Sequence, residues 1–140
     1  MKREHVTEDR LADYLPLMQQ LRPHLASLED FAQRFRRMSA GGYRLIGFSE
    51  DGALVALAGV RVMETLIHGR FLYVDDLVTT QAARRGGVGA RVMDDLKAEA
   101  RALDCAKLVL DTALDNVLAH RFYYRQGLVA AALRFNVTFR

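Results

Sequence analysis

The chain has very little cysteine. Its 140 residues include only Cys105, so no disulfide can form within the chain, which is typical of a reducing cytoplasm. Cys105 follows a predicted helix and precedes an apolar strand, a placement that favours a buried, unreactive thiol over a nucleophile. No apolar run approaches the roughly 18 residues that a membrane span requires. Residues 1–5 do not lead into the apolar segment of a signal peptide. We therefore expect a cytoplasmic protein.

Charge of one sign is not in large excess either, since the chain has 20 Lys and Arg residues and 17 Asp and Glu residues. The basic residues form short arginine clusters, without the dense basic surface and interleaved aromatics of nucleic-acid binding proteins. We expect no nucleic-acid partner and no membrane partner. The chain contains 51% hydrophobic residues and no repeat or low-complexity linker, so residues 1–140 are expected to form a single domain.

Residues that commonly bind metals are few and scattered. None of the four histidines has a His, Cys or carboxylate neighbour at a spacing typical of metal ligands. No nucleophile-elbow sequence supports a Ser–His–Asp triad. We predict no metal site, and we expect His120 to lie on the surface of a helix.

Hydrophobic periodicity predicts elements in the order β-α-α-β-β-β-α-β-α-β. The strands are expected over residues 2–7, 43–49, 53–63, 70–79, 107–111 and 128–139. The helices are expected between Asp9 and Pro23, between Ser27 and Gly41, over 90–103, and from Asp115 or Asn116 to Gln126. Three antiparallel-looking strands followed by a β-α-β unit predict an α/β (α+β) fold in which helices cover a mixed sheet.

A glycine-rich loop joins the strand over 70–79 to the next helix. Three glycines within four residues let a ligand approach the backbone, because no Cβ intervenes. The first turn of the helix adds unpaired N–H groups and a positive dipole end, and two arginines add charge. The loop is therefore predicted to bind phosphate groups. Its candidate binding residues are Arg84, Arg85, Gly86, Gly87, Val88, Gly89 and Ala90.

Two common nucleotide motifs do not fit this loop. A dinucleotide fingerprint requires a small residue where Val92 stands, and it normally opens a fold rather than lying past its middle. A P-loop requires Gly-Lys-Ser/Thr, whereas Gly89 is followed by Ala90 and Arg91. The loop thus indicates another phosphorylated ligand, or a tight strand-to-helix turn that binds nothing.

Asp75 and Asp76 interrupt an apolar strand, where a carboxylate needs water or a partner. Successive side chains of a strand point to opposite faces. We therefore expect one of the two carboxylates to face a reaction cleft and the other to be structural, and the sequence does not say which.

Two segments resemble motifs of the GCN5-related N-acetyltransferase (GNAT) superfamily. Residues 84–89, Arg-Arg-Gly-Gly-Val-Gly, are similar to its pyrophosphate loop, Gln/Arg-x-x-Gly-x-Gly/Ala. Residues 119–128, Ala-His-Arg-Phe-Tyr-Tyr-Arg-Gln-Gly-Leu, resemble its A-x-x-F-Y-x-x-x-G-F signature, and Asn116 precedes them as in the family. Arg85 stands where glycine is usual, and Leu128 replaces the common Phe. The resemblance implies a single mixed, mostly antiparallel sheet of about 6–7 strands flanked by about four helices.

This resemblance implies acetyl-CoA as co-substrate and an amine that attacks its thioester directly. The pantetheine arm would pair with Leu77, Val78 and Thr79, and the Leu77 amide would stabilise the developing oxyanion. Backbone N–H groups of residues 86–90 would hold the pyrophosphate. Asn116 and Tyr123 would also contact the co-substrate.

Two proton transfers then need catalytic groups. A protonated alkylamine must lose a proton, and Asp76 or Asp75 is the expected base, directly or through water, with Tyr73 as a weaker candidate. The departing thiolate must gain a proton, and Tyr123 matches the family's tyrosine in that role. We prefer Tyr123 to Tyr124 because it directly follows the phenylalanine of the motif.

The leading function is acetyl transfer from acetyl-CoA to a primary amine of a small molecule or a protein. The alternative is a non-catalytic acyl-CoA-binding or regulatory module with the same fold. Residues 22–42 and 64–70 would contact the acceptor, but they contain no cluster that identifies it. The final strand, 128–139, is apolar enough to support a homodimer.

Overall fold

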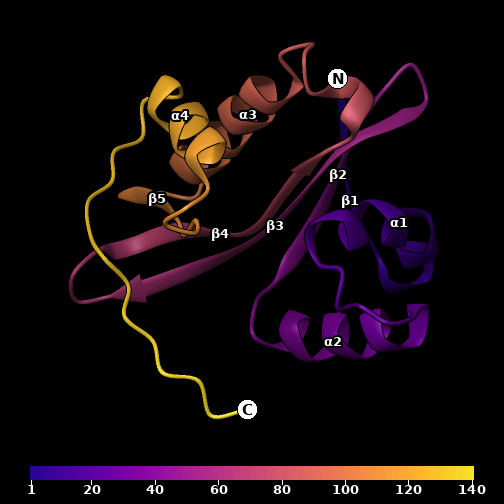
Figure 1. Cartoon of the computed structure of the whole chain (residues 1–140), viewed down its shortest axis with the longest axis horizontal. Coiled ribbons are helices and arrows are strands. Elements are labelled where there is room, and N and C mark those ends of the chain that lie inside the picture. The colour runs from indigo at the N-terminus through magenta and orange to yellow at the C-terminus, as the bar shows by residue number, and fades with distance from the viewer.

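One mixed sheet separates two pairs of helices (Figure 1). The computed structural model describes all residues from 1 to 140. The strands are β1 (Lys2–His5), β2 (Arg44–Glu50), β3 (Ala53–Thr65), β4 (Gly69–Thr79) and β5 (Lys107–Leu110). The helices are α1 (Leu11–Leu21), α2 (Leu28–Ala40), α3 (Val88–Ala102) and α4 (Val117–Arg125). The strands lie in chain order, and all neighbours are antiparallel except β4 and β5, which are parallel.

The predicted helix ends are confirmed by their capping bonds. The Ser27 hydroxyl accepts a hydrogen bond from the Asp30 amide at 3.1 Å and begins α2. The Asn116 side chain accepts a backbone hydrogen bond and begins α4. Gly127 follows α4 with a φ of 87°, a conformation that only glycine adopts without strain. The predicted turn at Asp51-Gly52 also joins two antiparallel strands, with positive φ at both residues.

The core has two layers, one on each face of the sheet. On one face, α1 and α2 pack through side chains such as Leu11, Met18 and Phe31. On the other face, α3 contributes the predicted stripe of Val88, Val92, Leu96 and Ala100. Figure 1 shows α1 and α2 on one side of the strands and α3 and α4 on the other. β4 is therefore covered by α1 on one face and by α3 on the other.

Two predictions about the C-terminal part of the sheet are wrong. The sheet has five strands, not 6–7, because residues 128–139 form no strand and leave the outer edge of β5 unpaired. The apolar run in β5 is half-buried rather than buried. Alternating apolar residues favour a strand, but a strand forms only where it can pair with the edge of another strand.

Candidate active site

A bulge in β4 organises the candidate site. Gly59 of β3 lies opposite Asp76, but the next residue, Val60, lies opposite Val74. Asp75 is therefore an extra residue without a partner on β3. Such a bulge changes which side chains and which backbone groups face each side of the strand.

The backbone groups of β4 reverse direction across this bulge. Before it, the Arg70 carbonyl accepts a hydrogen bond from the residue that precedes β5. After it, the Thr80 amide donates to β3 at 2.9 Å. Since alternate residues face opposite edges, Leu77 and Thr79 direct their backbone groups away from β3. The backbone of Val78 points toward β3, and its side chain is buried against α1 and α2.

The edge that Leu77 and Thr79 face has no neighbouring strand. The parallel pairing of β4 with β5 ends at Val74 and Leu110, whereas β4 continues to Thr79. The two strands thus part beyond these residues. An extended ligand rich in amides can pair there as a strand would.

The glycine-rich loop leaves five backbone N–H groups without a hydrogen-bond acceptor in the protein. Gly87 adopts a φ of 74° and caps α3, which directs the first amides of the helix outward. The Gly86 amide differs, since it donates to the Ala83 carbonyl at 3.1 Å. The free N–H groups belong to Arg85, Gly87, Val88, Gly89 and Ala90. They form a cluster of donors suited to phosphate oxygens.

The side chains around this loop support the same use. Arg84 and Arg85 are exposed and form no ion pair with the protein's own carboxylates. A Cβ at Gly89 would lie 3.2 Å from the Phe122 ring, so glycine allows α4 to pack against the first turn of α3. α4 thus packs against the start of α3, while Arg84 and Arg85 are exposed to solvent.

The carboxylates of Asp75 and Asp76 lie on the same side of the sheet, not on opposite sides. Asp76 is 9% exposed; it accepts hydrogen bonds from the Tyr43 hydroxyl at 2.7 Å and from Arg22 Nε at 2.9 Å. Asp75 forms a two-point ion pair with Arg61, at 3.0 and 2.9 Å. The Arg61 guanidinium lies 5.5 Å from the centre of the Tyr43 ring. The expectation of opposite faces is wrong because it assumed a regular strand, and the bulge at Asp75 brings the two acids together.

Burial changes the acidity of the groups in this cluster. It raises the pKa of Asp75, and the hydrogen bond and charge of Arg61 offset only part of that effect. Burial also raises the pKa of Tyr43, and the nearby charge of Asp76 raises it further. Tyr43 therefore stays protonated and serves as a donor to Asp76. A Cβ at Gly59 would collide with both of these side chains, so the cluster needs glycine at that position.

A cavity of about 250 Å³ lies between α1, α2 and the Asp76 end of the bulge. Most of its lining is apolar, and Asp76 is its single carboxylate. It is lined by Met18, Arg22, His24, Leu25, Phe31, Arg34, Phe35, Met38, Tyr43 and Asp76. Asp75 is not among these residues. The cavity can hold a small organic group beside a carboxylate, with basic side chains nearby.

The tyrosines that sequence analysis compared have different surroundings. Tyr123 is half-buried beside Phe122, and its hydroxyl forms no hydrogen bond within the protein. Burial raises its pKa, so the phenol is protonated at neutral pH. Tyr124 is 58% exposed. The Tyr73 hydroxyl is engaged with Asp111 at 2.8 Å, and burial first, then this bond, raises its pKa to about 12.

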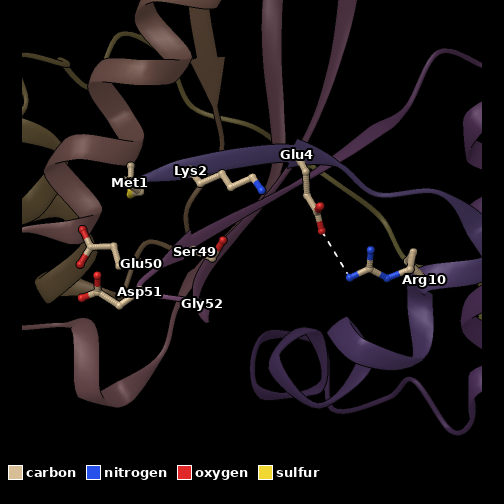
Figure 2. Close-up of a pocket in the computed structure, with 8 residues that line it drawn as sticks. All are labelled: Met1, Lys2, Glu4, Arg10, Ser49, Glu50, Asp51 and Gly52. Carbon is tan, nitrogen blue, oxygen red and sulfur yellow. Dashed lines mark ion pairs between the residues drawn. The ribbon is translucent and has the colours of Figure 1, made fainter.

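A larger hollow of about 790 Å³ opens at the N-terminal end of β1 (Figure 2). Met1, Lys2 and Glu4 lie on one side of it, and the turn from Ser49 to Gly52 lies on another. Figure 2 shows Glu4 paired with Arg10, at 3.5 Å. The lining is polar and solvent-exposed, and it contains neither an apolar floor nor a buried polar group without a partner. We therefore place the candidate site at the bulge and not in this hollow.

A model of the Acetyltransferase (GNAT) family matches residues 5–128. The chain belongs to this family. The GNAT chain is 30% identical over 118 residues to the uncharacterized N-acetyltransferase YhdJ of Bacillus subtilis, covering 84% of this chain and 82% of that protein. It is 32% identical over 133 residues to glucosamine 6-phosphate N-acetyltransferase 1 of Oryza sativa subsp. japonica, covering 90% of this chain and 79% of the relative.

The fold of this GNAT protein agrees with solved structures. A ribosomal-protein-alanine N-acetyltransferase from Brucella melitensis superposes with a TM-score of 0.84 at 17% identity, covering 99% of this chain and all of the other. The family and these relatives show that the GNAT chain is an acyltransferase of the N-acetyltransferase type. None of its helices is both long and apolar enough to cross a membrane. No three His, Cys, Asp or Glu side chains are grouped as metal ligands would be.

Sequence analysis did not single out three residues of the site, although Arg22 begins the segment 22–42 that was expected to contact the acceptor. Arg22 lies 54 positions before Asp76, and nothing in the local sequence links the two. Tyr43 follows a pair of glycines and looks like an ordinary strand residue. Arg61 is the one that the sequence could have indicated. An arginine inside the apolar run of β3 needs a partner, as the aspartates of β4 do. Asn116, expected to contact the co-substrate, uses its side-chain oxygen to cap α4.

Proposed function

We propose that this protein transfers an acetyl group from acetyl-CoA to a primary amine, which attacks the thioester directly in a ternary complex. The observation that carries the proposal is the bulge at Asp75. It turns the Leu77 amide to an open edge of β4 while it directs the Asp76 carboxylate into a cavity. The thioester of acetyl-CoA and the amine that attacks it can thus meet at this point of β4.

The residues on the donor side fit a CoA thioester. The free amides at the start of α3, with Arg84 and Arg85, would hold the pyrophosphate. Leu77 and Thr79 would pair with the pantetheine amides along the open edge, as a neighbouring strand would. A thioester is reactive enough for direct attack by a free amine. The Leu77 N–H would donate to the carbonyl oxygen, where negative charge develops.

Asp76 would act on the acceptor side. An alkylamine is protonated at neutral pH, so an anionic carboxylate attracts it and then takes its proton, directly or through a water molecule. Asp76 faces the cavity, whereas Asp75 has both oxygens held by Arg61. Arg22 is 40% exposed, so its guanidinium can turn to solvent when an ammonium group takes its place. We therefore assign the base to Asp76 and a supporting role to Asp75.

Tyr123 would supply the last proton. Its hydroxyl is protonated, half-buried and unengaged, so it is able to donate to a departing thiolate without first breaking another bond. The Asn116 amide nitrogen, free on the other side of the capping oxygen, would contact CoA as well.

The test is a screen for free thiol released from acetyl-CoA in the presence of amines. The panel contains glucosamine 6-phosphate, because the rice relative is named for it. It also contains aminoglycosides, polyamines, amino acids and peptides with a free N-terminus. We expect one class to release thiol in proportion to acetylated amine identified by mass spectrometry. Binding of CoA without thiol release for any amine would contradict the proposal and favour a binding module.

A further inference from the structure

The cavity beside Asp76 has an apolar wall that the protein's own side chains do not fully cover. Most of this wall comes from α2, whose Phe31, Phe35 and Met38 lie at positions i, i+4 and i+7 and therefore on one face of the helix. Phe31 is buried, whereas Phe35 and Met38 are only partly buried although they pack against the core. Part of the apolar face of α2 is thus left for a ligand to cover.

The charged groups of the cavity lie at its two ends. The Asp76 carboxylate is buried at the inner end, whereas His24 and Arg34 are exposed and lie where the cavity opens to solvent. Arg34 is held by Asp30, whose two carboxylate oxygens accept hydrogen bonds from Arg34 Nε at 2.8 Å and from the Ala26 amide at 3.2 Å. Asp30 does not line the cavity. Asp76 is therefore the one acid that a ligand in the cavity can contact.

We propose that the acceptor is a small monoamine, that is, a primary amine with a single positive charge and a compact apolar body. This inference rests on the proposed function and names the substrate class of the same site. The ammonium group would lie against Asp76 and the apolar body against Phe35 and Met38. The amine nitrogen bonds to the thioester carbonyl carbon and the carbon–sulfur bond breaks. The products are an N-alkylacetamide, the CoA thiol and one proton, which Asp76 passes to solvent.

The size and the lining of the cavity disfavour larger and more polar amines. Its volume of about 250 Å³ lies below the roughly 300–1,000 Å³ of pockets that hold drug-sized ligands. It corresponds to roughly eight water molecules of about 30 Å³ each, which suits an amine of about ten non-hydrogen atoms and not an aminoglycoside. The hydroxyl groups of an amino sugar would face mostly apolar side chains. They would lose hydrogen bonds to water without gaining partners, which is unfavourable.

A second positive charge on the acceptor would also be unfavourable. Once the first ammonium group occupies Asp76, no carboxylate of the lining is left to pair with another one. The Tyr43 hydroxyl is already a donor to Asp76, at 2.7 Å. Arg22 and Arg34 would repel a further cation. An apolar end would instead cover Met38 and its neighbours on α2, which removes apolar surface from water.

Two amines of equal size test this inference on the wild-type protein. Hexylamine and 1,5-diaminopentane differ only in whether a methyl or an ammonium group ends the same chain. We expect kcat/KM for thiol release, and the association constant from calorimetric titration in the presence of CoA, to be about 10-fold higher for hexylamine. Both quantities should also be higher for hexylamine than for glucosamine 6-phosphate. Equal or higher values for 1,5-diaminopentane or for the sugar would overturn the inference.

The titration separates failure of this inference from failure of the proposed function. If no amine releases thiol but hexylamine binds more tightly than 1,5-diaminopentane, the proposed function is wrong and the ligand class of the cavity is supported. If a peptide or a polyamine releases thiol and hexylamine does not, the proposed function stands and the inference is overturned. If neither hexylamine nor 1,5-diaminopentane binds, the inference is overturned as well.

A carboxylate added to the apolar wall tests the cavity directly. Met38→Glu should lower the preference for hexylamine over 1,5-diaminopentane by about 10-fold, because the second ammonium group gains an acidic partner. Ala12→Glu is the matched control, since it adds the same charge at an exposed position of α1 outside the cavity, and it should leave the preference unchanged. Circular dichroism establishes that both variants are folded. An unchanged preference in folded Met38→Glu, or an equal fall in both variants, would show that this cavity does not select the acceptor.

Discussion

The donor side and the acceptor side that we propose for this GNAT protein are built from different parts of the chain. The donor side uses backbone amides of neighbouring residues, exposed to solvent and without partners. The proposed acceptor side uses the side chains of Arg22, Tyr43, Arg61, Asp75 and Asp76, which come from distant parts of the chain and are engaged with one another. A ligand can bind the first without rearrangement, whereas the second must exchange one of its own contacts for the substrate. Substitutions should therefore affect the two sides in different ways.

The largest effect is expected at Asp76. Asp76→Asn removes the charge that faces Arg22 and attracts the ammonium group, so kcat/KM for the amine should fall by about 1,000-fold. Arg22 would lose its ionic partner, and the free energy of unfolding should fall by about 2 kcal/mol. Steady-state thiol release and urea denaturation measure the two quantities.

Asp75→Asn is the matched control for this prediction. It removes the same charge one residue away, outside the cavity, and should reduce kcat/KM by about 10-fold. If the two variants lose equal activity, Asp76 is not distinguished from Asp75 as the base.

The next effect is expected at Tyr123. Tyr123→Phe removes only the hydroxyl, so kcat should fall by about 100-fold while KM for acetyl-CoA stays nearly constant. Because burial raises the pKa of Tyr123, the phenol keeps its proton as the pH rises from neutral into the mildly alkaline range, and wild-type kcat should not fall through its ionisation there. Tyr124→Phe, at an exposed position, should change neither constant. An unaltered kcat in Tyr123→Phe would remove this residue from the mechanism.

A smaller effect is expected at Gly87. Gly87→Ala puts a Cβ on a residue with a φ of 74°, which costs about 1–2 kcal/mol, so the free amides of α3 should be displaced and the affinity for acetyl-CoA should fall by about 10-fold. Gly86→Ala is the control, because its Cβ would lie 3.7 Å from the nearest atom and its φ is not positive. Calorimetric titration with CoA compares them. Equal losses in the two variants would argue against a ligand role for the loop's conformation.

The smallest effect is expected from the exposed arginines. Arg84→Gln/Arg85→Gln should raise KM for acetyl-CoA about fivefold and make it less sensitive to salt, because only screened surface charge is lost. kcat should not change. Assays at two salt concentrations test this, and a large fall in kcat would show that the arginines do more than bind phosphate.

Whether a feature could be predicted from the sequence depends on how far apart along the chain its interacting residues lie. The caps at Ser27 and Asn116 and the turn at Gly127 were predictable because each is a contact between residues a few positions apart. The glycine turn before α3, with its free amides, was predictable for the same reason. The acceptor cluster was not, since Arg22 and Asp76 meet only when α1 packs on β4.

The bulge at Asp75 shows that contacts with distant residues also limit prediction within a single strand. The neighbouring residues Asp75 and Asp76 indicated that this part of the strand is unusual, but the regular alternation of a strand predicted that they lie on opposite faces. Pairing with β3 decided otherwise, because the partner strand selects which residue is left over. Residues 128–139 are the converse case, in which a clear strand pattern finds no partner strand within the chain.

By itself, the sequence determined the succession of elements from β1 to α4, the helix caps and the loop of free amides, because backbone conformation there depends on residues next to one another. The tertiary structure alone decided how many strands the sheet has, which carboxylate faces the cavity and which partners hold it. Those outcomes depend on edges and side chains that are brought together from distant parts of the chain, and local preference carries no information about such encounters.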